Sequence, residues 1–562
     1  MCCVASVLGC TTSQTSVQSL PHMRVTLAQL NPRLGDIDGN LGLISDAIDR
    51  ALSEGADLIV FPELVLTGYA PRDLLFFPDF REKIAEGISK LLELSHLKEI
   101  HILVGAPLWV PEKQQFTNSM LGLYKGDMAY VQHKTLLPYY DIFDDRRYFC
   151  PSPNGASCWA IHGRRVGVLI CEDAWADLEP YRYAVDPLVD TMALGVDLLV
   201  VAMASPYEVG KPETRRQHFQ SIARTYACPV VMVNQVGAHD DVIFDGNSLV
   251  VAKEGRVQQP GVAFAPALLT VSLGSDERPV LASQTEESRL AEIYEALVFS
   301  LKEYVRKTGF LDVVLGLSGG IDSALAAAIA VDALGADRVT GVAMPSRYSS
   351  PESLTDAVAL AKTLGIAFKV LPISEIHQMY ESLLPEVFGT GLAAENIQPR
   401  IRGNLLMGLT NAQQALLLST GNKSEIAMGY CTLYGDMCGA FCVLGDVYKT
   451  EVFALARWRN RDGVLIPQNT LDKPPSAELR PNQTDQDSLP PYEILDGILQ
   501  AYLDARQPKA SIDAAYGEPL VRSVLIQFHR NEYKRRQAAI IPRLRKTAFG
   551  TGYRMPVVGM MP

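Results

Sequence analysis

The sequence lacks the features of a membrane, extracellular or fibrous protein. It has no apolar run of the about 18 residues that a membrane-spanning helix needs. Its 10 cysteines are irregularly spaced, without the paired spacing typical of disulfide frameworks or structural metals. An excess of positive charge is also missing, because 63 acidic residues outnumber 51 Lys and Arg residues. We therefore expect a cytoplasmic protein that binds neither membranes nor nucleic acids.

The composition is that of a folded protein with more than one domain. Hydrophobic residues make up 48% and charged residues 20% of the 562 residues. At roughly 150 residues per domain, this length predicts at least two domains. Residues 1–22 contain no Lys or Arg. Val7 to Cys10 resembles a lipoprotein cleavage box, but too few residues precede the cysteine for a signal peptide. We expect residues 1–22 to be a flexible extension, with Met23 as the alternative start.

The first half consists of apolar, β-branched runs that alternate with helical segments. The runs cover residues 24–29, 56–61, 101–107, 165–171, 196–205 and 229–235. Because these runs are apolar throughout, they predict sheets that are buried on both faces. The polar residues at their ends, Glu63, Cys171, Ser205 and Asn234, should then gather at one edge of the sheets.

The second half has the pattern of a parallel sheet. A predicted helix over residues 289–308 precedes strands at 312–317, 339–344 and 367–373, which alternate with helices. This alternation predicts a doubly wound α/β fold. The Ser, Thr and Glu-rich stretch 275–288 is predicted to be a linker. The expected domains are therefore residues 23–274 and 289–562.

The most specific motif of the second half lies between a predicted strand and a predicted helix. It reads Ser318, Gly319, Gly320, Ile321, Asp322 and Ser323. Two glycines let the backbone close around a phosphate, and the helix N-terminus supplies unpaired N–H groups. The lysine of a Walker A motif is missing. A serine-rich turn capped by Asp322 is the simpler alternative, but the strand and helix on either side favour a phosphate loop.

This loop resembles the pyrophosphate loop of the ATP pyrophosphatases, which split ATP between the α and β phosphates and leave an adenylated substrate. The resemblance implies ATP as a co-substrate and Mg²⁺ as a cofactor. Asp322 is the first candidate metal ligand, since carboxylates together with phosphate oxygens suit Mg²⁺. Glu425, in a second predicted strand-to-helix turn, is the other.

Three further segments, residues 395–402, 445–451 and 473–479, resemble the NAD+ synthetases, in which deamido-NAD+ is adenylated and ammonia displaces AMP. The resemblance runs from about residue 289 to the C-terminus and implies an adenine nucleotide alpha hydrolase-like fold. It implies ATP contacts at residues 318–323, Thr420 and Lys449, and metal contacts at Asp322 and Glu425. It also implies deamido-NAD+ contacts at Arg400, Glu425 and Lys534. Cationic Arg400 and Lys534 suit a pyrophosphate and a carboxylate, although a solvated helix face would look similar.

The first half contains the nucleophile, base and cation that a thiol-dependent amide hydrolase needs. Cys171 lies where a predicted strand ends in a turn. Glu63 and Lys134 are charged residues in apolar surroundings, which is costly unless they are paired or functional. A lone buried cysteine would be the simpler interpretation of Cys171, but its candidate partners favour catalysis.

These segments, with Val104 to Pro107, resemble the nitrilase superfamily over about residues 24–273. The resemblance implies an αββα sandwich in which Glu63 is the general base, Cys171 forms a thioester and Lys134 stabilises the oxyanion. The segment that contains Ser205 and Lys211 resembles one that binds glutamine, with Tyr140 on the opposite wall.

Together the two halves resemble the glutamine-dependent NAD+ synthetases. The resemblance implies glutamine, ATP and deamido-NAD+ as substrates, an ammonia passage between two sites, and assembly as a homo-oligomer. Two alternatives remain open at this point. One is another glutamine-fed ATP pyrophosphatase, for example one that aminates a nucleobase. The other is a nitrilase-fold amidase whose second half only senses a nucleotide.

Overall fold

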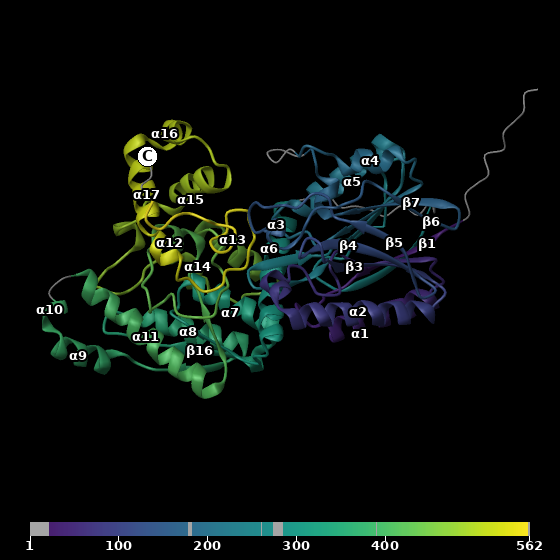
Figure 1. Ribbon diagram of the computed structural model, residues 1–562. Coiled ribbons are helices and arrows are strands. Elements are labelled where there is room, and N and C mark those ends of the chain that lie inside the picture. Colours follow the sequence, from purple (N-terminus) through teal and green to yellow (C-terminus); the bar gives the residue numbers. More distant parts are fainter. Residues whose placement is uncertain (1–21, 178–182, 260, 274–284, 389–390, 560–562) are drawn as a thin grey trace, which may run out of the picture.

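A computed structural model describes residues 22–177, 183–259, 261–273, 285–388 and 391–559. Most of the predicted extension and linker lies outside these ranges. The two halves lie side by side, with the first half in purple and blue and the second in teal to yellow (Figure 1). No helix among the described residues is long and apolar enough to cross a membrane.

The first half is a sandwich of two six-stranded sheets. One sheet has the order β14-β1-β2-β3-β4-β5 and the other β13-β12-β9-β8-β7-β6. The strands of the first sheet are β1 (Arg24–Gln29), β2 (Leu58–Val60), β3 (His101–Val110), β4 (Gln115–Tyr124), β5 (Asp127–His133) and β14 (Ala267–Ser272). Those of the second are β6 (Cys158–Ile161), β7 (Arg164–Ile170), β8 (Leu198–Met203), β9 (Val230–Asn234), β12 (Leu249–Val251) and β13 (Val257–Gln259).

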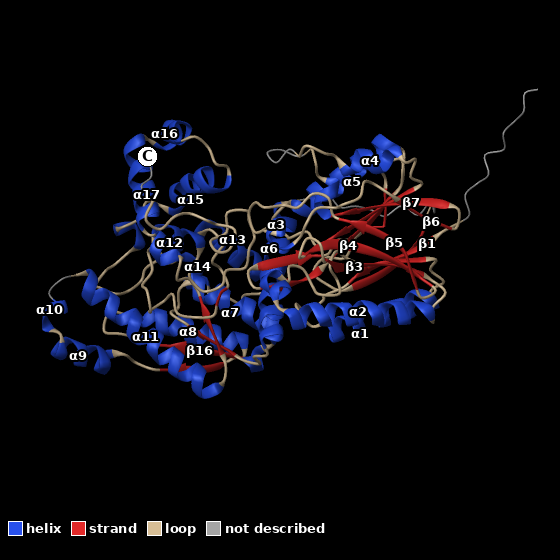
Figure 2. Ribbon diagram, in the orientation of Figure 1, coloured by secondary structure: helices blue, strands red, loops and turns tan. Residues whose placement is uncertain are grey.

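Helices cover the outer face of each sheet, which completes the αββα layers (Figure 2). Helices α1 (Ile37–Ser53) and α2 (Pro78–His96) lie on one side, and α4 (Pro187–Ala193) and α5 (Lys211–Tyr226) on the other. Fully buried side chains of both sheets, such as Val60 and Val200, belong to one apolar cluster between them. The predicted sandwich is therefore confirmed, and the runs that suggested it are β1, β2, β3, β7, β8 and β9.

The second half is built on a parallel sheet with the order β17-β16-β15-β18-β19. Its strands are β15 (Val313–Gly316), β16 (Val339–Ala343), β17 (Ala367–Val370), β18 (Leu416–Ser419) and β19 (Phe441–Cys442). All their pairings are parallel. The chain starts in the centre and winds outward in both directions, so the predicted doubly wound topology is confirmed.

Helix α6 (Glu286–Thr308) joins the halves. Its buried Leu297 belongs to an apolar cluster that also contains Ile243 of the first half and Leu325 of the second. Near its C-terminus, Lys307 Nζ donates to Asn31 Oδ1 (2.7 Å) and to the Ala238 carbonyl (3.1 Å). One helix therefore contributes to the cores of both halves.

Two candidate active sites

Cys171 lies at the end of β7, in a short 3₁₀ turn over Cys171–Ala174. Its φ angle is +48°, a region that non-glycine residues rarely adopt. Asp173 fixes the turn, because its carboxylate accepts hydrogen bonds from the backbone N–H groups of Thr135 (3.0 Å) and Leu136 (2.7 Å). The turn that carries Cys171 is thus tied to the segment that carries Lys134.

Glu63, Lys134 and Cys171, which we predict to act together, lie close to one another and are all buried. Lys134 Nζ donates to Glu63 Oε1 at 2.7 Å, and both side chains are almost completely buried. Burial raises the pKa of the Cys171 thiol well above its usual value, and nearby Glu63 raises it further while Lys134 lowers it. The cysteine therefore rests as a thiol, and a base must remove its proton before it can act as a nucleophile.

Sequence reasoning missed Asp145, which holds Lys134 from the other side. Asp145 begins α3 (Asp145–Tyr148), and its Oδ2 accepts a hydrogen bond from Lys134 Nζ at 2.7 Å. Its Oδ1 accepts one from the Tyr69 hydroxyl at 2.9 Å. An ammonium between two buried carboxylates stays charged, since both raise the pKa of Lys134 although burial alone would lower it. No sequence signal singles it out, because Asp145 is the third Asp within residues 141–145, 11 positions after the lysine.

The residues predicted to bind glutamine lie around Cys171. Tyr140 and Lys211 lie close enough to Cys171 that a thiolate there would raise the pKa of both. Ser205 follows β8, and its N–H donates to Asn234 Oδ1 at 2.9 Å. Sequence reasoning missed Glu172, which is buried next to the nucleophile and accepts hydrogen bonds from the hydroxyls of Tyr140 (2.8 Å) and Tyr183 (2.8 Å). The site thus combines a cation, Lys211, with an anion, Glu172.

The glycine loop of the second half lies between β15 and α7 (Ile321–Leu334). Gly319 has φ +78°, and a Cβ there would overlap the backbone of Ser353. The Gly320 N–H donates to Ser318 Oγ (3.1 Å), and Ser323 Oγ donates to the Gly320 carbonyl (3.0 Å). Gly319 thus permits a close turn that a side chain would block.

Asp322 and Glu425 converge on one ammonium. Lys449 Nζ lies 2.5 Å from Asp322 Oδ2 and 3.1 Å from Glu425 Oε1. Asn422, which caps α12 (Lys423–Met428), donates to Asp322 Oδ1 at 2.8 Å. Burial raises the pKa of Glu425 to about 8, with Asp322 and Asp485 adding to the rise and Lys449 opposing it. A cation bound between Asp322 and Glu425 would favour the ionised form of both carboxyl groups.

These residues line a cavity of about 320 Å³. Most of the predicted ATP contacts line it, with Gly319 next to it in the loop. The lining residues among them are Ser318, Gly320, Ile321, Asp322, Ser323, Thr420 and Lys449. Glu425, the predicted metal and deamido-NAD+ contact, also lines it. Sequence reasoning did not single out Arg402 and Lys473, two cations that also line the cavity.

The structure does not place Arg400 and Lys534 on the cavity wall. Lys534 Nζ donates to the carbonyls of Gly429 (2.6 Å) and Cys431 (2.7 Å), and Arg400 Nε donates to that of Leu433 (3.2 Å). Cys431 itself lines the cavity. Both residues therefore support a loop at the cavity rim, and their predicted contact with deamido-NAD+ stays a prediction.

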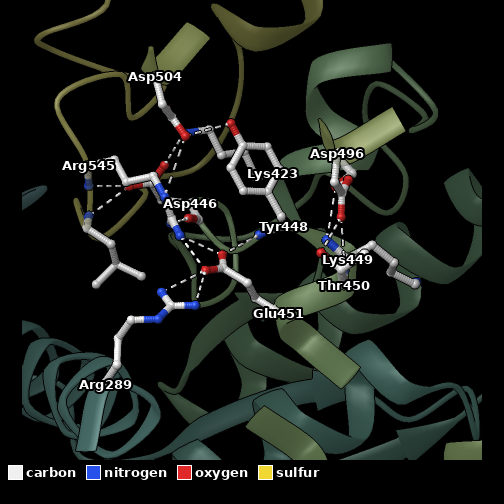
Figure 3. A network of polar contacts seen from close by, with 12 residues as sticks. Arg289, Lys423, Asp446, Tyr448, Lys449, Thr450, Glu451, Asp496, Asp504 and Arg545 are labelled. Atoms are coloured by element: carbon white, nitrogen blue, oxygen red, sulfur yellow. Dashed lines mark hydrogen bonds and ion pairs between the residues drawn. The ribbon is translucent and has the colours of Figure 1, made fainter. Parts of the chain in front are cut away.

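A polar network supports the two helices that carry Glu425 and Lys449 (Figure 3). Asp496 accepts hydrogen bonds from Ser424 Oγ (2.5 Å) on α12 and from Thr450 Oγ1 (2.8 Å) on α13 (Lys449–Arg459). Lys423 pairs with Asp446 at 2.8 Å, and neither side chain is exposed. The network therefore fixes the N-terminal turns of both helices.

Comparison with known proteins assigns each half of the chain, and so each candidate site, to a different family. Residues 24–276 match the carbon-nitrogen hydrolase family, and residues 293–538 match the NAD synthase family. The chain thus combines a nitrilase-type amide hydrolase with an ATP-dependent amidating ligase.

Whole-chain relatives carry the same combination. A glutamine-dependent NAD(+) synthetase from Synechocystis sp. is 44% identical over 95% of this chain and 98% of its own length. A glutamine-dependent NAD(+) synthetase from Thermotoga maritima is 40% identical over 96% of this chain and 99% of its own length. The solved structure of a glutamine-dependent NAD+ synthetase from Acinetobacter baumannii in complex with ADP is 39% identical in sequence and has a TM-score of 0.75. The match covers 96% of this chain and 99% of that one. The chain belongs to the glutamine-dependent NAD+ synthetase family.

Gly105→Ala tests the support of Glu63. Gly105 lies in β3, and a Cβ there would overlap the backbone of Pro62 and Leu64 on either side of Glu63. We expect the substitution to lower the free energy of unfolding by about 1–3 kcal/mol and to reduce glutamine hydrolysis. Gly42→Ala, in α1 with open space around it, is the matched control. It should lower neither the free energy of unfolding nor the rate of glutamine hydrolysis. Unchanged stability and hydrolysis in Gly105→Ala would contradict this interpretation.

Proposed function

We propose that this chain hydrolyses glutamine at Cys171 and uses the ammonia to amidate an adenylate that it forms from ATP and deamido-NAD+. The products are glutamate, NAD+, AMP and pyrophosphate. The observation that carries the proposal is that a buried Glu63, Lys134 and Cys171 cluster and a glycine-loop cavity with Asp322, Glu425 and Lys449 occur in one chain.

In the first site, Glu63 would take the proton of the Cys171 thiol, and the thiolate would attack the side-chain carbonyl of glutamine. Lys134 would stabilise the oxyanion. Collapse would form a thioester and release ammonia, with Glu63 returning the proton to the leaving nitrogen, and water would then hydrolyse the thioester. Lys211 would pair with the α-carboxylate of glutamine and Glu172 with its α-ammonium, with Ser205 and Tyr140 completing the pocket.

In the second site, the loop of residues 318–323 would hold the phosphates of ATP, with Thr420 and Lys449 as further contacts. Asp322 and Glu425 would hold Mg²⁺, which neutralises charge on the departing pyrophosphate. The described residues contain no cluster of three or more metal-ligating side chains. Two carboxylates nevertheless fit this ion, because Mg²⁺ usually takes one or two carboxylates together with substrate phosphates.

Deamido-NAD+ would bind beside Glu425, with Lys534 and Arg400 shaping the rim of the cavity. The Arg402 guanidinium lies in the wall itself and donates to the Met344 carbonyl at 3.0 Å. It is a further candidate for an anionic acceptor. A cytoplasmic location fits the unpaired cysteines of the described residues.

The experiment that tests the whole proposal is product analysis with ATP, Mg²⁺, deamido-NAD+ and glutamine labelled with ¹⁵N on its amide. We expect labelled NAD+ together with AMP and pyrophosphate. Hydrolysis of glutamine with intact ATP would refute the synthetase assignment and favour the sensing alternative. Use of ATP only with another acceptor would favour a different ATP pyrophosphatase.

Cys171→Ala separates the two sites. We expect glutamine-driven synthesis to fall by about 1,000-fold or more, while ammonia-driven synthesis stays within about twofold, because only the ammonia source is removed. Parallel assays with glutamine and with ammonium chloride measure both. Loss of the ammonia-driven reaction in a folded variant would show that the sites are not separate.

Asp322→Asn tests the second site. Loss of one carboxylate should lower synthesis with either nitrogen donor by roughly 100-fold or more, whereas glutamine hydrolysis should remain measurable. Assays of NAD+ and of glutamate with each donor give the two rates. Undiminished synthesis would remove Asp322 from the proposed metal site.

We also propose that the chain forms a homo-oligomer through α9 (Ser374–Leu383). Four large side chains, Ile376, Met379, Tyr380 and Leu383, lie at helical spacing on one exposed stripe. A second copy with the same stripe would cover it. Leu383→Glu should lower the molar mass measured by light scattering, whereas Gln378→Glu on the same helix should not. An unchanged mass in both variants would exclude this interface.

A further inference from the structure

Arg543 belongs to the second half but its side chain enters the first. It lies in the segment after α18 (Glu532–Arg535) and is 2% exposed. Its Nη2 contacts Asp141 and donates to Glu208 Oε1 at 2.7 Å. Figure 1 shows the yellow C-terminal segment at the junction with the blue first half.

The backbone around Arg543 is fixed to both halves. The Arg543 N–H donates to the Asp241 carbonyl (2.8 Å), and the Leu544 carbonyl accepts from the Val209 N–H (3.0 Å), both in the first half. The Leu544 N–H donates to Asp446 Oδ2 at 2.7 Å, in the polar network of the second half. The backbone that carries the Arg543 side chain is therefore held against both halves.

The two carboxylates that Arg543 contacts flank the candidate glutamine pocket. Asp141 follows Tyr140, on one wall, and Glu208 precedes Lys211, on the other. Glu208 Oε1 lies 3.9 Å from Lys211 Nζ, compared with 2.7 Å from Arg543. Glu208 is thus shared between two cations, and Arg543 holds it more closely.

We propose that Arg543 is a positioning residue of the glutamine site, which holds Glu208 away from Lys211 and keeps the Lys211 ammonium available for the α-carboxylate of glutamine. Without Arg543, Glu208 would move toward Lys211, whose Nζ lies 3.9 Å from Glu208 Oε1, and would compete with the substrate. The inference rests on the proposed function, because it presupposes that glutamine binds at Lys211.

The geometry also predicts which kinetic constant changes. In the first half the Arg543 side chain contacts Asp141 and Glu208 rather than Glu63, Lys134 or Cys171, so the chemical step should be largely independent of it. Competition for Lys211 instead weakens binding of the ground state and transition state alike, which raises KM rather than lowering kcat.

The test measures glutamate release against glutamine concentration, with the full chain, ATP, Mg²⁺ and deamido-NAD+. Arg543→Met should raise KM for glutamine about tenfold, which corresponds to ~1.4 kcal/mol, with kcat within about threefold. Arg522→Met, an exposed arginine on α17 (Glu518–Arg530), is the matched control and should leave both constants unchanged.

The double variant Arg543→Met/Glu208→Gln distinguishes competition from lost packing. Removing the competing carboxylate should return KM to within about threefold of the original value, whereas a packing defect would persist or worsen. Arg543→Lys, which retains a cation, should give a KM between those of the unsubstituted chain and Arg543→Met. It replaces the methionine variant in the test if that variant does not fold.

Ammonia-driven synthesis by each variant checks that the second half is intact. An unchanged KM in Arg543→Met, or an equally raised KM in the single and double variants, would overturn the inference. Absence of glutamine hydrolysis in the unsubstituted chain would instead refute the proposed function.

Discussion

A buried charge is tolerated only where opposite charges and hydrogen bonds surround it. Both candidate sites are arranged around this constraint, and in both the central charge is a lysine. Lys134 lies between Glu63 and Asp145, and Lys449 lies between Asp322 and Glu425. In each site the ammonium fixes two carboxylates that come from different elements. Removing either lysine would leave these carboxylates without the positive charge that balances them.

The support around these lysines follows from the same constraint. The Asp496 carboxylate accepts from two helix N-terminal turns, and Asp173 accepts from the segment after Lys134. Both carboxylates pair with buried backbone N–H or hydroxyl donors that would otherwise have no hydrogen-bond partner. The rigid position of the reactive groups is thus a by-product of satisfying buried polar atoms.

The sequence predicted those parts whose signal is local. Continuous apolar runs marked β1, β7, β8 and β15 because strands buried on both faces need them. Strands such as β4 and β5, whose pattern is mixed, were not predicted. Glu63 and Cys171 were predicted because strand ends meet at a sheet edge. Asp145, Glu172 and Arg543 were not, because their roles depend on contacts between segments that carry no motif.

The two halves are not fully separate, because the C-terminal segment contacts both of them. Residues 541–554 belong to the second half and pack on it, but several of them also contact loops of the first half. During synthesis on the ribosome, the first half emerges long before this segment exists. The candidate glutamine pocket therefore receives Arg543 only after most of the second half has been synthesised, and a chain that stops before residue 543 would lack the arginine proposed to position it.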